Sequence, residues 1–317
     1  QLFAAFDLGL APETEAFPRS ASVRIVLYPF DAAWGFRAAA QGYYDRFPEA
    51  FTRRIPPPRE GLWVASSDLA PIPDIADFGI AIHELGSLRQ VAFDDSAGIL
   101  SFRYIAEPWS HWLAIDDETV DPEDEDSVED YLYRLEQRGN ERAQATISSG
   151  FHDERGRLRY RPTDAPWCHG TAGCAVFTVN PDPDIHDPFY PMNKAFLEWN
   201  DAARETYLLT GLDGEYVDSY LGQAMELDLR RSHFAAVDTP LTFATRNRRV
   251  GIPQVFATTE FARWLTDEVH DDLPEAVRLP EAGDGLGHAV EGRSQGLLPG
   301  SGNDLLGPPM GILDHGL

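Results

Sequence analysis

Residues 99–109 read ILSFRYIAEPW, a short apolar run that ends in a glutamate, a proline and a tryptophan. Two other runs have the same construction: CAVFTVNPDPD at residues 174–184 and GEYVDSY at residues 214–220. Apolar runs of this length are typical of strands buried on both faces of a parallel sheet. The carboxylates at their C-terminal ends are costly to bury alone, so they should face a polar mouth. The pattern predicts strands of an α/β barrel that open onto an active site.

The segments around these runs alternate between strand and helix patterns. Strands are predicted at residues 62–65, 78–82, 100–106, 175–179 and 215–218, and helices at residues 127–137, 193–209 and 258–270. Strand, helix and strand with short connections form the repeating unit of a parallel sheet. A complete barrel of this kind needs eight strands. The predicted fold is therefore α/β, a partial (β/α)8 barrel of the TIM type.

The two ends of the chain differ from this central part. Residues 1–58 are predicted to be the end of a β-rich accessory domain, with strands at residues 3–10 and 22–28, a linking helix at 32–47 and a stiff IPPPR connector. Residues 59–270 are assigned to the partial barrel. Residues 271–317 contain no Phe, Tyr or Trp and ten glycines, which predicts a disordered or frame-shifted tail. The alternative is a flexible tail on a complete, smaller domain.

The chain carries 52 acidic and 26 basic residues, for a net charge of -26, and Lys194 is its only lysine. Such a charge repels nucleic acid and anionic membranes, so neither is expected as a partner. No apolar run is long enough to span a membrane. Either a salt-loving or a GC-rich source explains the composition, and the excess of acid favours the first. The chain starts at Gln1 without a signal-peptide pattern, so we interpret it as a piece of a longer protein, with a cytoplasmic location slightly favoured and no indication of oligomeric state.

No cofactor or metal is predicted. Cys168 and Cys174 are spaced for a small disulfide loop, and Cys168 next to His169 also suggests a metal ligand, but zinc needs more ligands than these and free thiols are favoured. The acid-rich run from Asp116 to Asp130 lacks the ligand order of an EF-hand, which favours a solvated loop. The chain has no glycine-rich phosphate loop between a strand and a helix and no G-x-S-x-G motif.

Asp218 and Glu107 are the candidate catalytic residues. Asp218 closes the EYVD strand, where a rigidly held carboxylate suits a nucleophile that attacks a sugar carbon. Glu107 is followed by tryptophans, whose apolar surface raises the pKa of a neighbouring acid, as a proton donor requires. Each has a structural alternative: Asp218 is a good helix cap, and Glu107 is within reach of a salt bridge to Arg103.

Six further residues are candidates for substrate binding. Trp109, His111 and Trp112 follow Glu107 closely and are predicted to line a sugar subsite, because an indole ring stacks on the C–H face of a sugar. Asp182, in the NPDPD turn, and His83 and Glu84, after the FGIAI strand, are predicted to hold substrate hydroxyls. A rigid turn or a helix cap is the structural alternative for Asp182.

Several short motifs together resemble a known group of proteins. They are AWGFR at residues 33–37, YY at 43–44, FP at 47–48, EPW at 107–109, NPDP at 180–183 and GEYVDS at 214–219. This set resembles uncharacterised glycoside-hydrolase-like (β/α)8 barrels with a preceding β-sandwich, and is more distantly similar to α-galactosidase-type barrels. The resemblance implies that Asp218 is the nucleophile. It places the acid on a later strand, beyond the part of the barrel seen here.

The sequence therefore predicts a glycoside hydrolase-like protein that acts on an O-glycosidic bond of a carbohydrate by a carboxylate-based, retaining mechanism. The resemblance leaves open whether this piece of the barrel is active. A non-catalytic carbohydrate-binding barrel is the first alternative. The second is a metal-dependent barrel hydrolase that uses His83, His111 and Asp218.

Overall fold

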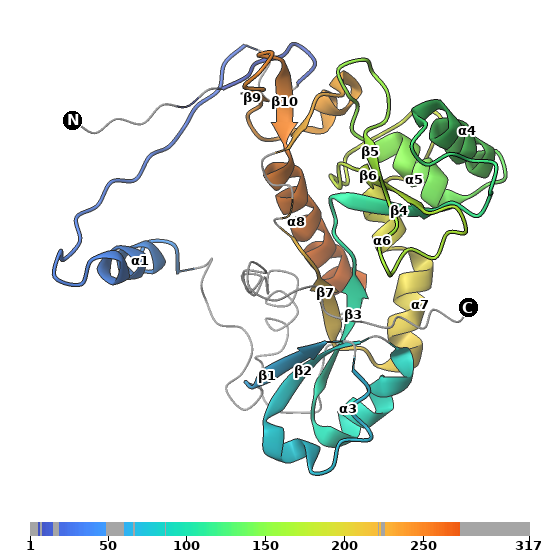
Figure 1. Ribbon diagram of the computed structural model, residues 1–317. Coiled ribbons are helices and arrows are strands. Elements are labelled where there is room, and N and C mark those ends of the chain that lie inside the picture. Colours follow the sequence, from blue (N-terminus) through green and yellow to red (C-terminus); the bar gives the residue numbers. More distant parts are fainter. Residues whose placement is uncertain are drawn as a thin grey trace.

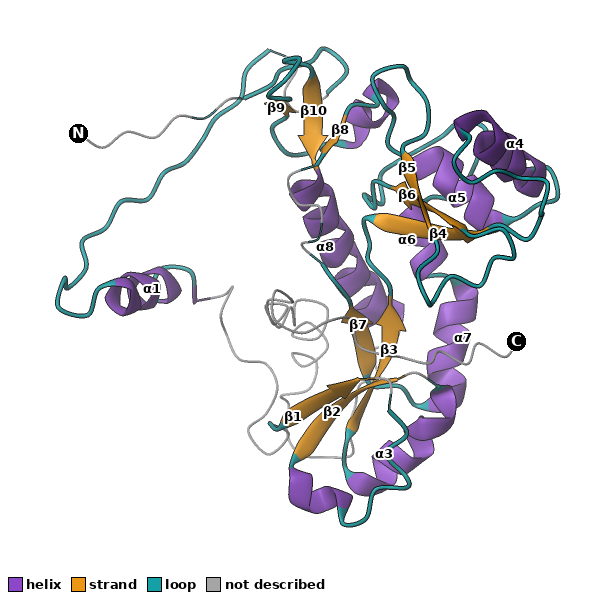
Figure 2. Ribbon diagram, viewed as in Figure 1, coloured by secondary structure: helices purple, strands orange, loops and turns teal. Residues whose placement is uncertain are grey.

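The computed structural model describes residues 6, 8–14, 19–48, 60–65, 67–85, 87–220, 222 and 226–272. This part of the chain is a mixed α/β structure with a parallel sheet of four strands, two small antiparallel sheets and helices packed between them (Figures 1 and 2). No helix within it is long and apolar enough to cross a membrane.

The parallel sheet has the strand order β1-β2-β3-β7, so each strand pairs with the parallel strand nearest to it in the chain. Its strands are β1 (Leu62–Ala65), β2 (Ile80–Leu85), β3 (Leu100–Ile105) and β7 (Gly214–Val217). Short helices connect the first three strands: η2 (Ile75–Phe78), η3 (Leu88–Gln90) and α3 (Val91–Ala97). The strands predicted at residues 62–65, 100–106 and 215–218 are confirmed to within a residue.

The strand predicted at residues 78–82 begins and ends later than expected. Residues up to Phe78 form the 3-10 helix η2, and Gly79 follows it with φ 65°. Because glycine adopts this left-handed conformation without strain, the chain turns at Gly79 and the strand starts at Ile80. His83 and Glu84 consequently lie inside β2 and point to opposite faces of the sheet.

Helices cover one face of the parallel sheet and form the main core with it. Leu85 and Ile105 of the sheet pack with Trp199 and with Phe261 and Leu265, all fully or almost fully buried. These partners come from the segment around α6 (Lys194–Glu198) and α7 (Asp201–Thr210) and from the long helix α8 (Gln254–Asp272). Burial of these large apolar side chains holds the helices against the strands.

The predicted helix at residues 193–209 is two helices, α6 and α7. Trp199 leaves the helical conformation, and the side chain of Asn200 accepts a hydrogen bond from Ala203 N as the cap of α7. The break lets Trp199 reach the core, where it is 2% exposed. The helical spacing of apolar residues continues through the break, so the sequence does not indicate whether Asn200 lies inside a helix or caps one.

An antiparallel sheet with the order β4-β6-β5 is inserted between β3 and β7. It consists of β4 (Ser110–Ala114), β5 (Tyr160–Thr163) and β6 (Cys174–Thr178), and it carries α4 (Glu125–Glu136) and α5 (Glu141–Ser149). The prediction that residues 175–179 form a strand is confirmed, but its placement in the parallel sheet is wrong. A wholly apolar run does not reveal the direction of its neighbours.

Two local predictions in this insertion also need correction. Cys168 and Cys174 form a disulfide instead of remaining free thiols, with a Cα–Cα distance of 5.9 Å across the tight turn that Gly170 and Gly173 make. Helix α4 begins at Glu125 with Asp124 as its cap, earlier than the predicted Ser127. In an acid-rich run several side chains are good caps, and the first one in position is used.

The remaining elements lie at the ends of the described chain. Strands β8 (Leu227–Asp228), β10 (Val250–Pro253) and β9 (Thr242–Phe243) form a small antiparallel sheet, with η4 (Arg231–Ala236) beside it. The linking helix is α1 (Phe36–Tyr44), shorter than predicted. The strand predicted at residues 22–28 is wrong: these residues form no strand, and most of their side chains are exposed. A strand needs a partner, and the alternating pattern here has none among the described residues.

Other predictions concern residues outside the described part of the chain. They are residues 3–5 and 7 of the strand predicted at residues 3–10, the IPPPR connector and the tail from residue 273 onward.

Candidate functional site

The candidate site lies on the face of the parallel sheet opposite the helical core. In register, Glu84 lies beside Phe102, Phe102 beside Gly214, and Tyr104 beside Tyr216. Because side chains alternate along strands, Glu84, Tyr104, Tyr216 and Asp218 share one face. We call this the acidic–aromatic face. It comprises Trp63, Glu84, Tyr104, Tyr216 and Asp218.

Asp218 directly follows β7 and is half-buried. Its backbone N–H donates to Ile105 O at 2.9 Å, which extends the ladder to β3. The Tyr104 hydroxyl donates to its Oδ2 at 3.0 Å, and the N–H of Ser219 donates to its Oδ1 at 2.7 Å. Both carboxylate oxygens are therefore oriented by hydrogen bonds, while no base pairs with them among the described residues.

Glu84 is 5% exposed, and no described residue gives its carboxyl group a hydrogen bond or an ion pair. Burial raises its pKa to about 8, with a smaller contribution from the negative charge of Asp218. At neutral pH Glu84 is therefore mainly protonated, and Asp218 on the same face is close enough for its charge to act on it. A protonated acid that shares a face with a second carboxyl group is an arrangement that provides a proton donor and a carboxylate.

Aromatic rings surround the two carboxyl groups. The Tyr216 ring stacks on Tyr104 with centroids 6.3 Å apart and on Trp63 with centroids 5.5 Å apart, both at an interplanar angle of 20°. Since β2 and β3 separate β1 from β7, the Trp63 and Tyr216 side chains lean toward each other over this face. Trp63 remains 39% exposed. The rings provide a partly open apolar surface beside the acids.

Glu107 lies two residues beyond β3 and is half-buried. Its Oε2 accepts a hydrogen bond from Ser110 Oγ at 3.0 Å. Burial raises the pKa of Tyr104, and the nearby charges of Asp218 and Glu107 raise it further, so both carboxylates lie near its hydroxyl. The structural alternative of a salt bridge from Glu107 to Arg103 is wrong, because Arg103 pairs with Glu215 on the helix-covered face.

Trp109 connects the antiparallel insertion to the loop that carries Asp218. Its indole Nε1 donates to Ser219 O at 2.8 Å, and its carbonyl accepts from Val179 N at 2.9 Å. The ring lies so close to Gly222 that an added Cβ would approach Nε1 to 2.5 Å. Ser219 itself has φ 44°, a left-handed conformation that costs free energy for a non-glycine residue. Trp109 is thus placed at the site, where it supports the loop.

His83 is not part of this arrangement. It is completely buried on the opposite face, where its Nδ1 lies 2.8 Å from Asp94 Oδ2. Ser101 Oγ donates to the same Asp94 oxygen at 2.9 Å. The prediction that His83 and Glu84 act together overlooks that adjacent residues of a strand point in opposite directions.

His111 and Trp112 lie on β4 in the antiparallel sheet. His111 is buried against Thr146, and burial, aided by the positive charges of Lys194 and Arg142, holds its pKa well below the usual value. Trp112 packs edge-on against Trp167 and carries Arg161 over its ring. The two residues do not join the acidic–aromatic face through any contact of the described residues.

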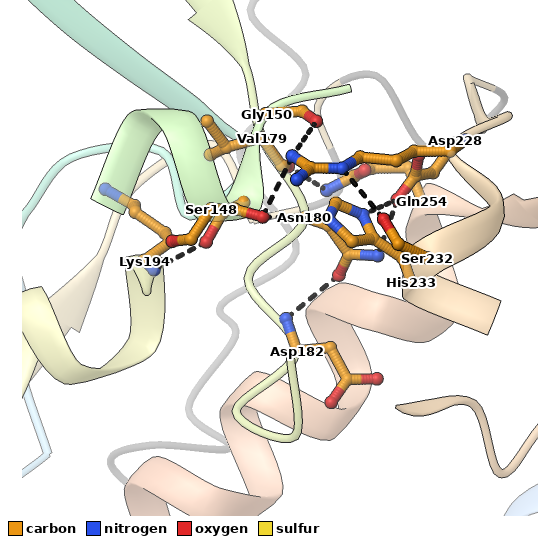
Figure 3. Close-up of polar contacts among 12 residues, drawn as sticks. Ser148, Gly150, Val179, Asn180, Asp182, Lys194, Asp228, Ser232, His233 and Gln254 are labelled. Carbon is orange, nitrogen blue, oxygen red and sulfur yellow. Dashed lines mark hydrogen bonds and ion pairs between the residues drawn. The ribbon is translucent and has the colours of Figure 1, made fainter. Parts of the chain in front are cut away.

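Asp182 belongs to a buried polar network at the end of β6, shown in Figure 3. Its N–H donates to Asn180 Oδ1 at 3.0 Å, and its Oδ1 accepts from Asp184 N at 2.9 Å. Burial raises the pKa of Asp182 to about 7. The side chain is 3% exposed, and the surrounding contacts are those of a rigid turn.

The same network contains a histidine–aspartate pair that the sequence did not indicate. His233 Nδ1 lies 2.6 Å from Asp228 Oδ2, and its Nε2 lies 2.8 Å from Ser148 O (Figure 3). Asn180 Nδ2 donates to Asp228, and Arg230 Nη1 donates to Ile147 O and Ser148 O. Both ring nitrogens are engaged and no hydroxyl contacts them in these bonds, so the pair ties α5 to the β8–β10 segment and is not a nucleophile–base pair.

The described residues contain no group of three or more His, Cys, Asp or Glu side chains arranged to hold a metal ion. His83, His111 and Asp218, the ligands of the metal-dependent alternative, lie on the buried face, in the antiparallel sheet and on the acidic–aromatic face respectively.

A cavity of about 400 Å³ lies between α7 and α8, away from these groups. Phe196, Arg204 and Trp264 are among its lining residues, and none of the predicted site residues lines it.

The sequence interpretation missed Trp63, Tyr104 and Tyr216 as site residues. The signal was present in the strand period: in FRYI and EYVD the tyrosine is two residues from a position on the acidic face. The register between β3 and β7 places the two tyrosines side by side. This register cannot be predicted from the sequence of one strand alone.

Comparison with known proteins adds no assignment: no family model, no curated protein and no solved structure matches the chain.

Proposed function

We propose that this protein is a glycoside hydrolase that cleaves an O-glycosidic bond with two carboxyl groups on the acidic–aromatic face. The observation that carries the proposal is the carboxyl group of Glu84, buried and without a partner among the described residues, on the same face as the oriented carboxylate of Asp218. Burying an acid without a partner is costly, and such groups concentrate at catalytic sites.

We further propose that the parallel sheet is part of a (β/α)8 barrel. The strand order β1-β2-β3-β7 follows the chain without a reversal. Barrel strands follow chain order, whereas doubly wound sheets reverse direction at a switch point. The site residues lie toward the C-terminal ends of the strands, where barrel enzymes carry their catalytic groups.

In the proposed reaction Asp218 attacks the anomeric carbon and forms a glycosyl ester. The glycosidic C–O bond breaks, its electron pair stays on the leaving oxygen, and Glu84 gives that oxygen its proton. Glu84, now a carboxylate, then takes a proton from water as the water oxygen attacks the anomeric carbon and releases Asp218. This is the retaining sequence, for which the two carboxyl groups stand roughly 5 Å apart.

The proton donor in this mechanism is Glu84, whereas the sequence alone predicted Glu107. Glu107 is bound by Ser110 Oγ and is half-exposed, whereas Glu84 is buried and protonated at neutral pH. We therefore assign the proton donor to Glu84 and keep Glu107 as a neighbouring charge. Trp63 and Tyr216 would stack on the sugar ring beside the scissile bond.

The test is turnover of a broad panel of aryl glycosides by wild type, Asp218→Asn, Glu84→Gln and Glu107→Gln. We expect Asp218→Asn to lose at least about 10³-fold in kcat, as removal of a catalytic group does. Glu84→Gln should lose activity mainly on substrates with poor leaving groups, because good leaving groups need no proton. Activity that survives Asp218→Asn unchanged would exclude the mechanism.

The second candidate is a carbohydrate-binding protein without catalysis. The stacked surface of Trp63, Tyr216 and Tyr104 supports it, because such a surface binds sugars without any chemistry. A wild-type protein that binds sugars and loses binding in Trp63→Ala, but hydrolyses no substrate of the panel, would favour this candidate.

A further inference from the structure

The acidic–aromatic face and Glu107 bring acidic side chains together, and no base in the described part of the chain balances them. Glu84, Glu107 and Asp218 form no ion pair with an arginine, lysine or histidine of the described residues. The nearest base along the strands, Arg103, is turned to the other face and held there by Glu215. The described residues therefore give the site a negative charge at neutral pH.

The pKa values of the neighbouring tyrosines also reflect the excess of acidic groups. Burial raises the pKa of Tyr216, and the further contributions come from Glu84 and Asp218. For Tyr104 the contributions after burial come from Asp218, Glu107 and Glu84. Positive charges nearby would lower these pKa values, and the contributions from the described residues include none. Among the described residues, the electrostatic environment of the stacked rings is set by acids alone.

The burial of Glu84 within this acidic cluster points to a ligand. Glu84 is 95% removed from solvent, shares its face with Asp218 and lacks a hydrogen-bond partner among the described residues. Stacked aromatic rings, one of them 39% exposed, adjoin it. A ligand with an apolar ring face and hydrogen-bonding groups would satisfy both surfaces.

We infer that the substrate is an amino sugar, a glycoside whose ring carries a free ammonium group. The rings of Trp63 and Tyr216 would take the C–H face of the sugar, and the carboxylates of Asp218 and Glu107 would attract its positive charge. A neutral sugar gains only the stacking contact. A uronic acid or sugar phosphate is repelled by the same carboxylates. This inference rests on the proposed glycoside site, and it names the class of sugar that the site selects.

Equilibrium binding to the full chain tests the inference without relying on turnover. The ligands are glucosamine, N-acetylglucosamine, glucose and glucuronic acid, with the matching galactose series, measured by calorimetry and ligand-observed NMR at mildly acidic pH. We expect the amino sugar of one series to bind at least about tenfold more tightly than its N-acetylated form, and the uronic acid to bind most weakly. The preference should shrink from about 0.1 M to about 1 M salt, because the screening length falls from about 10 Å to about 3 Å.

Variants test which side chains cause the preference for the amino sugar. Asp218→Asn keeps the shape of the side chain, removes its charge and should reduce the preference to about twofold. Glu107→Gln serves as a second, independent removal of charge at the site. Glu118→Gln is the matched control, because it removes one exposed acid from the distant acid-rich loop. Trp63→Ala should weaken all sugars alike, since it removes stacking and no charge.

The outcomes separate this inference from the proposed function. Glu84→Gln should retain the preference for the amine, because Glu84 is mainly protonated, while losing turnover. Equal binding of the amino and N-acetylated sugars, or a preference that survives Asp218→Asn, overturns the inference even if neutral glycosides are hydrolysed. A clear preference without hydrolysis of any glycoside overturns only the hydrolase. No binding of any sugar overturns both.

Discussion

The two faces of the parallel sheet carry similar polar groups and hold them in opposite ways. On the helix-covered face Arg103 pairs with Glu215 at 2.6 Å, and His83 pairs with Asp94 at 2.8 Å. On the acidic–aromatic face Glu84 is almost as deeply buried but has no partner among the described residues. The difference separates buried charges that stabilise the fold from those that we propose bind a ligand.

The contrast arises within single strands. His83 precedes Glu84, Arg103 precedes Tyr104 and Glu215 precedes Tyr216. Each pair of neighbours contributes one residue to each face, so the same backbone supports one face with buried ion pairs and one face where Glu84 has no partner among the described residues. The pairing on the first face is itself incomplete, because His83 Nε2 and Asp94 Oδ1 are buried without a hydrogen-bond partner.

The largest effect should follow from breaking the paired side. Arg103→Met leaves the Glu215 carboxylate, whose side chain is 2% exposed, without its partner. Removing one member of a buried ion pair costs about 3–5 kcal/mol. The free energy of unfolding, measured by urea denaturation, should fall by that amount.

Arg134→Met is the matched control for Arg103→Met. Arg134 pairs with Asp117 at 3.2 Å, but both side chains are well exposed, at 45% and 36%. Exposed pairs contribute about 1 kcal/mol or less. If the two variants lose the same stability, the paired face does not have the structural role assigned to it.

The burial of Glu84 on the acidic–aromatic face should make the free energy of unfolding depend on pH. Burial raises the pKa of Glu84 from 4.5 to about 8, so the folded protein binds a proton there that the unfolded chain releases. Stability is therefore complete below about pH 4.5 and falls as pH rises through this window toward 8. Glu84→Gln, which cannot ionise, should remove this loss. We expect the variant to equal wild type at the acid end and to exceed it at the alkaline end by roughly 4 kcal/mol.

The control for this comparison is Glu107→Gln, which removes a half-buried carboxylate from the same neighbourhood. The change in the slope of stability against pH should be larger in Glu84→Gln than in this control. A wild-type slope in Glu84→Gln would mean that Glu84 ionises freely in the folded state, and the proton-donor role would lose its basis.

Much of the parallel sheet was predictable from the sequence, but the antiparallel insertion was not. LWVA, LSFRYI and GEYV are short apolar runs between turn signals, and each forms a strand within a residue of its predicted limits. The run CAVFT has the same pattern and joins the other sheet, because partner choice depends on segments such as β4 and β5 that have mixed, weak patterns.

Residues of the candidate site could be predicted only where their position in or directly after a single strand was sufficient to place them. Asp218, Glu84, Glu107 and Trp109 were predicted from their positions after or within apolar runs, and contacts or charge interactions link each of them to Tyr104 or to the Asp218 loop. His83, His111 and Trp112 were predicted from their chemistry and from their proximity in sequence to the other candidates. Neither criterion indicates to which face of the sheet a side chain points. Which face a side chain occupies follows from strand parity and register, and those require the neighbouring strand.

The smallest expected change in stability belongs to Tyr104→Phe, which separates orientation of Asp218 from structural support. The variant loses the hydroxyl that donates to Asp218 Oδ2 at 3.0 Å and keeps the ring that stacks on Tyr216. One hydrogen bond contributes about 1 kcal/mol, so the fold should persist. Without it the carboxylate is held only by the N–H of Ser219, and kcat of glycoside hydrolysis should fall about 10–100-fold with little change in KM. Tyr160→Phe removes a comparable hydroxyl bond, to Pro122 O at 3.1 Å in the antiparallel insertion, and should cost similar stability while leaving kcat unchanged. Equal kcat values for the two variants would mean that the Tyr104 hydroxyl supports the fold alone, and the distinction between the two faces would then apply to Glu84 but not to Asp218.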